Sequence, residues 1–109
     1  MTIKRIAAVV VMMMTLTAYT HASHYSHPDK NISFTEMNSI DCLYILSDLY
    51  EDASAYICNY DDLVEALGED TEDLKEAMTY LNKYGRYIES EGAMFKCKDD
   101  EYVVFIFCD

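Results

Sequence analysis

The sequence has few of the residues on which common enzyme sites are built. Its 109 residues include only three glycines, one proline and no tryptophan. No glycine-rich phosphate loop, G-x-S-x-G nucleophile turn or H-E-x-x-H zinc motif occurs. The acidic stretches also lack the ligand spacing of an EF-hand calcium loop. We therefore expect a protein that is not an enzyme, has no catalytic residues and needs no metal or cofactor.

The chain also lacks an apolar run long enough for a typical membrane span. Residues 6–16 are almost wholly apolar, whereas a transmembrane helix needs roughly 17–25 such residues. Lys4 and Arg5 precede the run, and Thr20 and Ala22 lie at the small-residue positions expected before a cut after Ala22. This pattern is typical of a secretory signal peptide. We predict a signal peptide over residues 1–22, and hence a periplasmic or secreted protein. A retained membrane anchor is the alternative interpretation.

Positive charge is the third shortage. The chain has eight basic residues, of which Lys4 and Arg5 leave with the signal, against twenty acidic residues that all remain. Such a surface repels the phosphates of nucleic acids and the head groups of anionic membranes. We expect no nucleic-acid partner and no stable membrane insertion after cleavage. A basic protein is the partner that this charge favours.

Four cysteines fall in the exported part of the chain. A short secreted domain usually joins such cysteines in disulfides. A zinc site is the alternative, but no C-x₂-C pair is present. We predict two disulfides among Cys42, Cys58, Cys97 and Cys108.

Beyond the signal, the chain divides into a polar arm and one globular domain. Residues 23–32 contain the only proline and are predicted to be a flexible N-terminus. Residues 33–109 form the single domain, and its first half has three helical patterns with capping residues. The predicted helices are residues 34–52 after a capping box at Ser33 and Glu36, a second from Asn59 to Gly68, and a third from Thr71 to Gly85.

After the third helix the apolar spacing changes to that of strands. Residues 86–89 are predicted as a short strand. Residues 93–98 and 101–108 are predicted as an antiparallel hairpin that turns at Asp99-Asp100. Residues 55–58, between the first two helices, are either a short extended piece or a turn. The predicted fold is a small disulfide-linked α+β domain of about three helices followed by a C-terminal β-hairpin.

The order of these elements resembles a winged-helix arrangement. The segment DDLVEALGEDTEDLKEAMTYLNKYG has the rhythm of two successive helices, and the hairpin would be the wing. The resemblance implies that the third helix takes the position of a DNA-reading helix. Its acidic residues outnumber its basic ones, which argues against DNA binding. These charged residues are Glu72, Asp73, Glu76, Lys75 and Lys83.

A turn at Asp99-Asp100 sets the register of the predicted hairpin. Cys97 then lies opposite Tyr102. The position that faces Cys108 is about 20 Å farther along the strand, so a disulfide between Cys97 and Cys108 is excluded in this register. If all four cysteines pair, two options remain. They are Cys42–Cys97 with Cys58–Cys108, or Cys42–Cys108 with Cys58–Cys97.

The same register turns one face of the hairpin toward the helices and leaves the other without obvious cover. Either another part of the chain covers this second face, or it is a patch that binds a partner. The candidate partner-binding residues on it are Met94, Val103, Phe105 and Phe107.

Together these features predict a small exported acidic domain that binds another protein. The specific expectation is an inhibitor, immunity or lysis-control factor that acts in the periplasm. The nine tyrosines that follow the predicted signal peptide favour binding, because tyrosine suits protein contact surfaces. The alternative is a structural or accessory subunit of an envelope or secreted assembly that docks through its C-terminal strand.

Overall fold

A computed structural model describes residues 27–29 and 32–107 of the chain. The predicted signal peptide at residues 1–22 lies outside the described residues. The elements in chain order are α2 (Ser39–Leu49), β1 (Ser54–Asn59), α3 (Tyr60–Leu67), α4 (Glu72–Tyr84), β2 (Arg86–Glu89), β3 (Gly92–Lys96), a 3₁₀ turn (Lys98–Asp100) and β4 (Glu101–Ile106).

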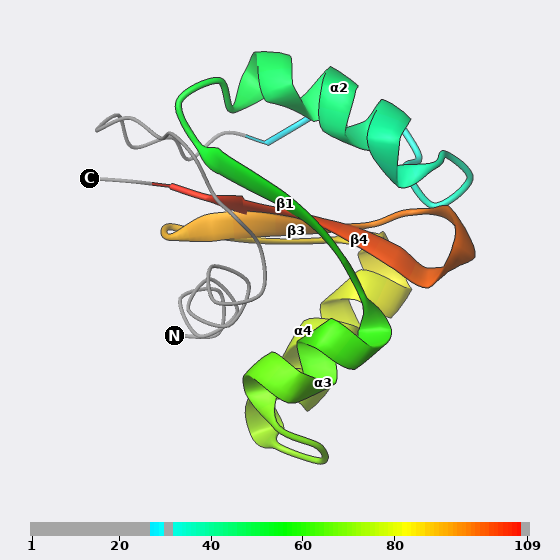
Figure 1. The fold of residues 1–109 in the computed structure, drawn as a ribbon, viewed down its shortest axis with the longest axis vertical. Coiled ribbons are helices and arrows are strands. Elements are labelled where there is room, and N and C mark those ends of the chain that lie inside the picture. Colours follow the sequence, from blue (N-terminus) through cyan, green and yellow to red (C-terminus); the bar gives the residue numbers. More distant parts are fainter. Residues whose placement is uncertain (1–26, 30–31, 108–109) are drawn as a thin grey trace.

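The strands form one antiparallel sheet of four strands in the order β1-β4-β3-β2. Helix α2 packs on one face of this sheet, and α3 and α4 lie together on the other (Figure 1). Each face therefore has its own hydrophobic core. The predicted α+β class is confirmed for the described residues, but the helices lie on both sides of the sheet and do not form one bundle.

The ends of α3 and α4 follow their predicted capping residues. Asn59 and Asp62 form a capping box, in which each side chain accepts a hydrogen bond from the other residue's backbone N–H. The Thr71 hydroxyl accepts a hydrogen bond from the Leu74 N–H at 3.2 Å and so caps α4. Helix α4 ends at Gly85, which adopts the left-handed conformation with φ of 77°. These predictions are confirmed.

The first helix starts later than predicted. Asn38 caps it by accepting a hydrogen bond from the Asp41 N–H at 2.8 Å. The capping box expected at Ser33 does not form, since the Ser33 hydroxyl lies 3.1 Å from a neighbouring threonine hydroxyl instead. Phe34 is buried in the core, so the chain before α2 turns inward. The predicted helix over residues 34–52 is therefore too long at both ends.

The segment before α3, left open as an extended piece or a turn, is the edge strand β1. It pairs with β4 along its whole length, from Ser54 opposite Ile106 to Asn59 opposite Glu101. Strand β4 consequently lies inside the sheet, between β1 and β3. The predicted C-terminal hairpin exists, but it is part of this larger sheet.

The turn of the β3–β4 hairpin is one residue longer than predicted. Cys97 lies opposite Glu101, and its N–H donates a hydrogen bond to the Glu101 carbonyl at 2.7 Å. Between them Asp99 and Asp100 both adopt positive φ, at 62° and 56°. Among residues other than glycine, aspartate is one of those that adopt positive φ most readily. The turn thus spans three residues where a two-residue turn was predicted.

The longer turn shifts the strand register by one residue. Phe95 lies opposite Val103, whereas Val104 was its predicted partner. Because side chains alternate along a strand, a one-residue shift moves every side chain of β4 to the other face. The core beneath α2 therefore receives the residues that were expected to lack cover.

All four predicted partner-binding residues are inside the protein. Val103 and Phe105 are fully buried in the core beneath α2, and Phe107 in the same core is 7% exposed. Met94 is fully buried on the opposite face, beneath α3 and α4. The expectation of an uncovered face is wrong, and these side chains offer no surface to a partner.

The sheet also separates the cysteines. Cys42 of α2 and Cys97 after β3 share one core, where their side chains approach to 2.8 Å. Cys58 of β1 lies in the core of the opposite face, so the predicted pairing of Cys58 with Cys97 is excluded. All three are free thiols in the structure. Cys108 lies outside the described residues, so the second disulfide, which would include Cys108, stays a prediction.

Candidate functional site

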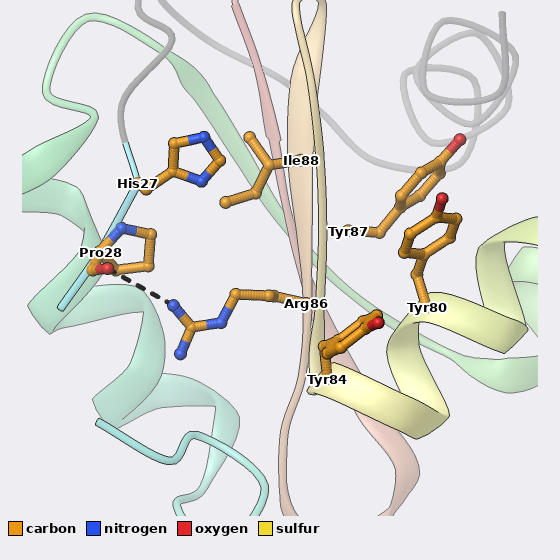
Figure 2. Close-up of a pocket in the computed structure, with 7 residues that line it drawn as sticks. All are labelled: His27, Pro28, Tyr80, Tyr84, Arg86, Tyr87 and Ile88. Carbon is orange, nitrogen blue, oxygen red and sulfur yellow. Dashed lines mark hydrogen bonds between the residues drawn. The ribbon is translucent and has the colours of Figure 1, made fainter. Parts of the chain in front are cut away.

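A pocket of about 620 Å³ lies along β2 at the edge of the sheet. Figure 2 shows that its lining residues come from both sides of this strand. We refer to it as the tyrosine pocket. It is lined by His27, Pro28, Tyr80, Tyr84, Arg86, Tyr87 and Ile88.

Three tyrosines form one side of the pocket. The rings of Tyr80 and Tyr87 are stacked, with centroids 5.0 Å apart and planes inclined by 17°. The ring of Tyr84 lies 6.0 Å from that of Tyr80. Tyr80 and Tyr84 remain 43% and 57% exposed, while Tyr87 is buried. The exposed rings provide the large contact area with a polar tip that protein interfaces favour.

Two glutamates act on the Tyr87 hydroxyl. It donates a 2.6 Å hydrogen bond to Oε2 of Glu76. Burial, followed by hydrogen bonding to and repulsion from Glu76 and Glu89, raises the pKa of Tyr87, so it stays protonated. Oε2 of Glu89 is buried and accepts no hydrogen bond from the described residues. A positively charged group is the natural complement of this carboxylate.

Arg86 organises the other side of the pocket. Its guanidinium donates hydrogen bonds to the backbone carbonyls of Pro28, at 3.5 Å, and Ile32, at 2.9 Å. It also lies over the Phe34 ring, 5.6 Å from the centroid. Pro28 is buried. The described part of the predicted flexible arm thus packs against β2.

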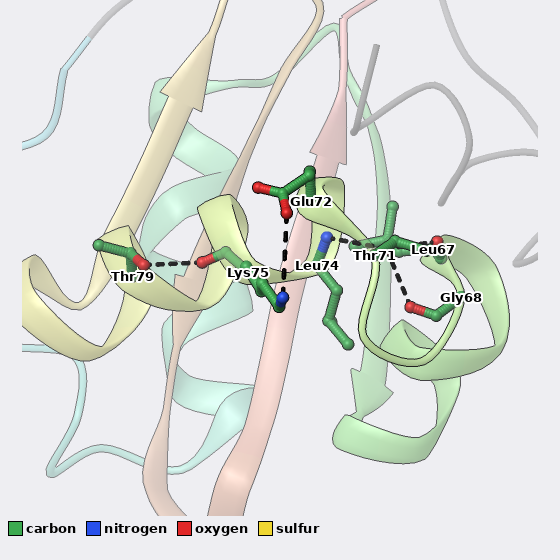
Figure 3. Close-up of polar contacts among 7 residues, drawn as sticks. All are labelled: Leu67, Gly68, Thr71, Glu72, Leu74, Lys75 and Thr79. Carbon is green, nitrogen blue, oxygen red and sulfur yellow. Dashed lines mark hydrogen bonds and ion pairs between the residues drawn. The ribbon is translucent and has the colours of Figure 1, made fainter.

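A second feature is the acidic helix pair, by which we mean α3, α4 and the loop between them. Residues 60–84 contain eight carboxylates and two basic residues, Lys75 and Lys83. The Lys75 ammonium lies 3.8 Å from Oε1 of Glu72, and both side chains are exposed (Figure 3). The carboxylates are those of Asp61, Asp62, Glu65, Glu69, Asp70, Glu72, Asp73 and Glu76.

Only part of this charge is used within the protein. Asp62 belongs to the capping box of α3, and Glu76 accepts from Tyr87. Glu65, Glu69 and Asp70 are exposed, and no described residue forms an ion pair with them. They give this end of the molecule a negative surface that is available to a partner.

Neither feature contains the arrangement of a metal site or a membrane segment. Among residues 27–29 and 32–107, no group of three or more His, Cys, Asp or Glu side chains is placed to hold a metal ion. No helix in this part of the chain has the length and apolarity to cross a bilayer.

Sequence reasoning does not single out Arg86 or Tyr87. The available signal is the alternation in RYIE, residues 86–89, which puts Arg86 and Ile88 on one face and Tyr87 and Glu89 on the other. This alternation does not show that β2 lies at the edge of the sheet, because the order of the strands depends on the tertiary structure.

The chain has no significant match to a protein-family model, a curated protein or a solved structure. The tyrosine pocket and the acidic helix pair are therefore the features from which a function can be inferred.

Proposed function

We propose that this protein is an exported, acidic binding domain that recognises a basic protein in the periplasm. The role that fits is an inhibitor, immunity or lysis-control factor, which acts by occupying its partner. The observation that carries the proposal is the acidic helix pair, with eight carboxylates and two lysines in residues 60–84. Complementary charge of this kind speeds encounter and selects basic partners.

The experiment is a binding titration with a basic cell-wall lysozyme as the probe, at low and at high salt. The test variant combines Glu65→Gln, Glu69→Gln and Asp70→Asn, which removes three exposed charges from the acidic helix pair. The matched control combines Glu36→Gln, Asp48→Asn and Glu51→Gln, which removes three exposed charges elsewhere. We expect the test variant to lose binding much more than the control, because the removed charges face the partner.

A mixture of periplasmic proteins extends the test beyond one probe. The immobilised chain should retain a basic protein at low salt and release it at high salt, because salt screens exposed charges. Retention of no basic protein at low salt would contradict the proposal. Equal losses in the two triple variants would show that net charge, rather than this surface, determines binding.

A disulfide between Cys42 and Cys97 is part of the same proposal, because an oxidising compartment favours it. Exchange with an oxidised disulfide reagent forms the new S–S bond and releases two reduced thiols of the reagent. The expected readouts are a mass loss of about 2 Da and protection of both cysteines from alkylation. In the chain-entropy model this closed loop stabilises the fold by about 4 kcal/mol.

Two alternatives receive less support. A structural or accessory subunit that docks through the C-terminal strand is less favoured, because β4 lies between β1 and β3 and the side chains of residues 102–105 are buried. A winged-helix-like DNA-binding role would use α4, whose acidic residues would meet the phosphates. Catalysis is not part of the proposal.

A further inference from the structure

Strand β2 has an open outer edge in the described part of the chain. On its inner side, the Gly85 carbonyl accepts a hydrogen bond from the Lys96 N–H at 2.9 Å, which fixes the phase of the ladder. Bonded positions alternate in an antiparallel pair. The backbone N–H and C=O of Arg86 and Ile88 therefore point away from β3, and no described residue bonds to them.

Side chains extend the recognition surface on both sides of this edge. Figure 2 shows Arg86 and Ile88 on one side of β2, and Tyr87 with Tyr80 and Tyr84 on the other. An added strand would place alternate side chains against these two sides. The free backbone groups of β2 can form hydrogen bonds with an added extended strand. The tyrosine pocket can bind large side chains of that strand.

The charges of this edge are arranged with opposite signs at its two ends. Lys83 and Arg86 lie at the end of β2 that follows α4. The Lys83 ammonium is 5.2 Å from the centroid of the Tyr84 ring. Glu89 lies at the other end, with its buried Oε2 free of hydrogen bonds from the described residues. If an identical strand runs in the opposite direction beside β2, the basic end of each strand lies next to the acidic end of the other.

We propose that β2 pairs antiparallel with β2 of a second copy of this chain, about a two-fold axis through Tyr87, to give a continuous sheet across a homodimer. In this register Arg86 lies opposite Ile88 of the second copy, so the outward backbone groups of both strands bond to each other. Tyr87 faces Tyr87, and the exposed tyrosines of both α4 helices meet above them. Lys83 of each copy approaches Glu89 of the other.

A second copy satisfies this edge because the surface is self-complementary, as a two-fold interface requires. The large negative charge of each chain opposes association at long range. At physiological salt, charges are screened over about 8 Å, so the contacts across the edge decide the outcome. The inference is independent of the proposed function, since it uses none of the exposed carboxylates of the acidic helix pair.

The test is sedimentation velocity of the full exported chain over a wide range of concentrations. We expect a reversible dimer. Lys83→Glu and Glu89→Lys each create like-charge contacts across the interface, and each should raise the dimer dissociation constant by about tenfold or more. Mixing these two variants should restore dimerisation as a heterodimer, because every cross-interface pair is then of opposite sign. A purely structural role of either residue does not predict this rescue.

Backbone and aromatic variants test the rest of the interface. Ile88→Pro removes an outward N–H without touching the ladder to β3 and should abolish the dimer, whereas Ile57→Pro, at an outward position of the other edge strand β1, should not. Tyr84→Ala should weaken the dimer and Tyr44→Ala, which removes a tyrosine that is 81% exposed on α2, should not. Lys98→Glu controls for added negative charge.

Circular dichroism identifies any variant that fails to fold. If Glu89→Lys does so, Lys83→Glu and Tyr84→Ala carry the test, because both residues are exposed. A wild-type chain that stays monomeric at every concentration overturns the proposal. So does a dimer that persists in Lys83→Glu, or that Lys98→Glu weakens equally. A mixture that forms no heterodimer also overturns it.

Discussion

Replacing Phe105 with alanine tests the position of β4 in the fold. The structure buries Phe105 completely beneath α2. Its ring centroid lies 5.0 Å from that of Tyr50 and 6.3 Å from that of Phe95. Truncation leaves a cavity among rings that helix and sheet hold in place. Substitutions of this kind cost about 3–5 kcal/mol, a large share of the roughly 5–15 kcal/mol that stabilises a typical domain.

Urea unfolding followed by circular dichroism measures this loss. With a slope of about 1–2 kcal/mol per molar urea, the midpoint should fall by roughly 2 M or more. Tyr44→Ala is the control, because Tyr44 is 81% exposed and should shift stability by less than about 0.5 kcal/mol. If Phe105→Ala were as mild as the control, Phe105 would lie on the surface. The one-residue register shift and the cover by α2 would then be wrong.

Three further changes test individual features of the fold. Thr71→Ala should lower the free energy of unfolding by about 1 kcal/mol through loss of the α4 cap, whereas Thr71→Ser should retain most of it. Gly85→Ala should cost about 1 kcal/mol in chemical denaturation, because φ is 77° and the added Cβ lies 3.3 Å from Cγ2 of Thr35. Burial raises the pKa of Tyr50 and of Tyr102 to about 12. Stability measured against pH should therefore be full below pH 10 and fall as pH rises toward 12, since only the unfolded chain then releases these protons.

The helix ends could be predicted because their signals are local. Asn59, Thr71 and Gly85 act through hydrogen bonds or backbone conformation within a few residues, so the sequence contains the whole interaction. The start of α2 was misplaced because Ser33 and Asn38 are both acceptable caps. The burial of Phe34 against the sheet, a long-range contact, decides between them.

The register of β4 could not be predicted because its apolar residues do not alternate with polar ones. The run YVVFIF, residues 102–107, is apolar at every position, so either face could point inward. Such a run is typical of a strand covered on both faces, and the structure places helices on both. A one-residue difference in turn length then decided which side chains meet α2. The helices on both faces, in either register, leave no docking patch on this strand.

The two cores also explain how the described fold can exist with its cysteines reduced. Strand β4 contributes Val103 and Phe105 to one core and Tyr102 and Val104 to the other, all essentially buried. The helices on each face are thus held through the same central strand without any covalent bond. Among the strands, helix α2 packs mainly on β1 and β4, and the Cys42–Cys97 contact joins it to the residue that follows β3. Oxidation of that pair would therefore strengthen the attachment of α2, while α3 and α4 would keep the packing they already have.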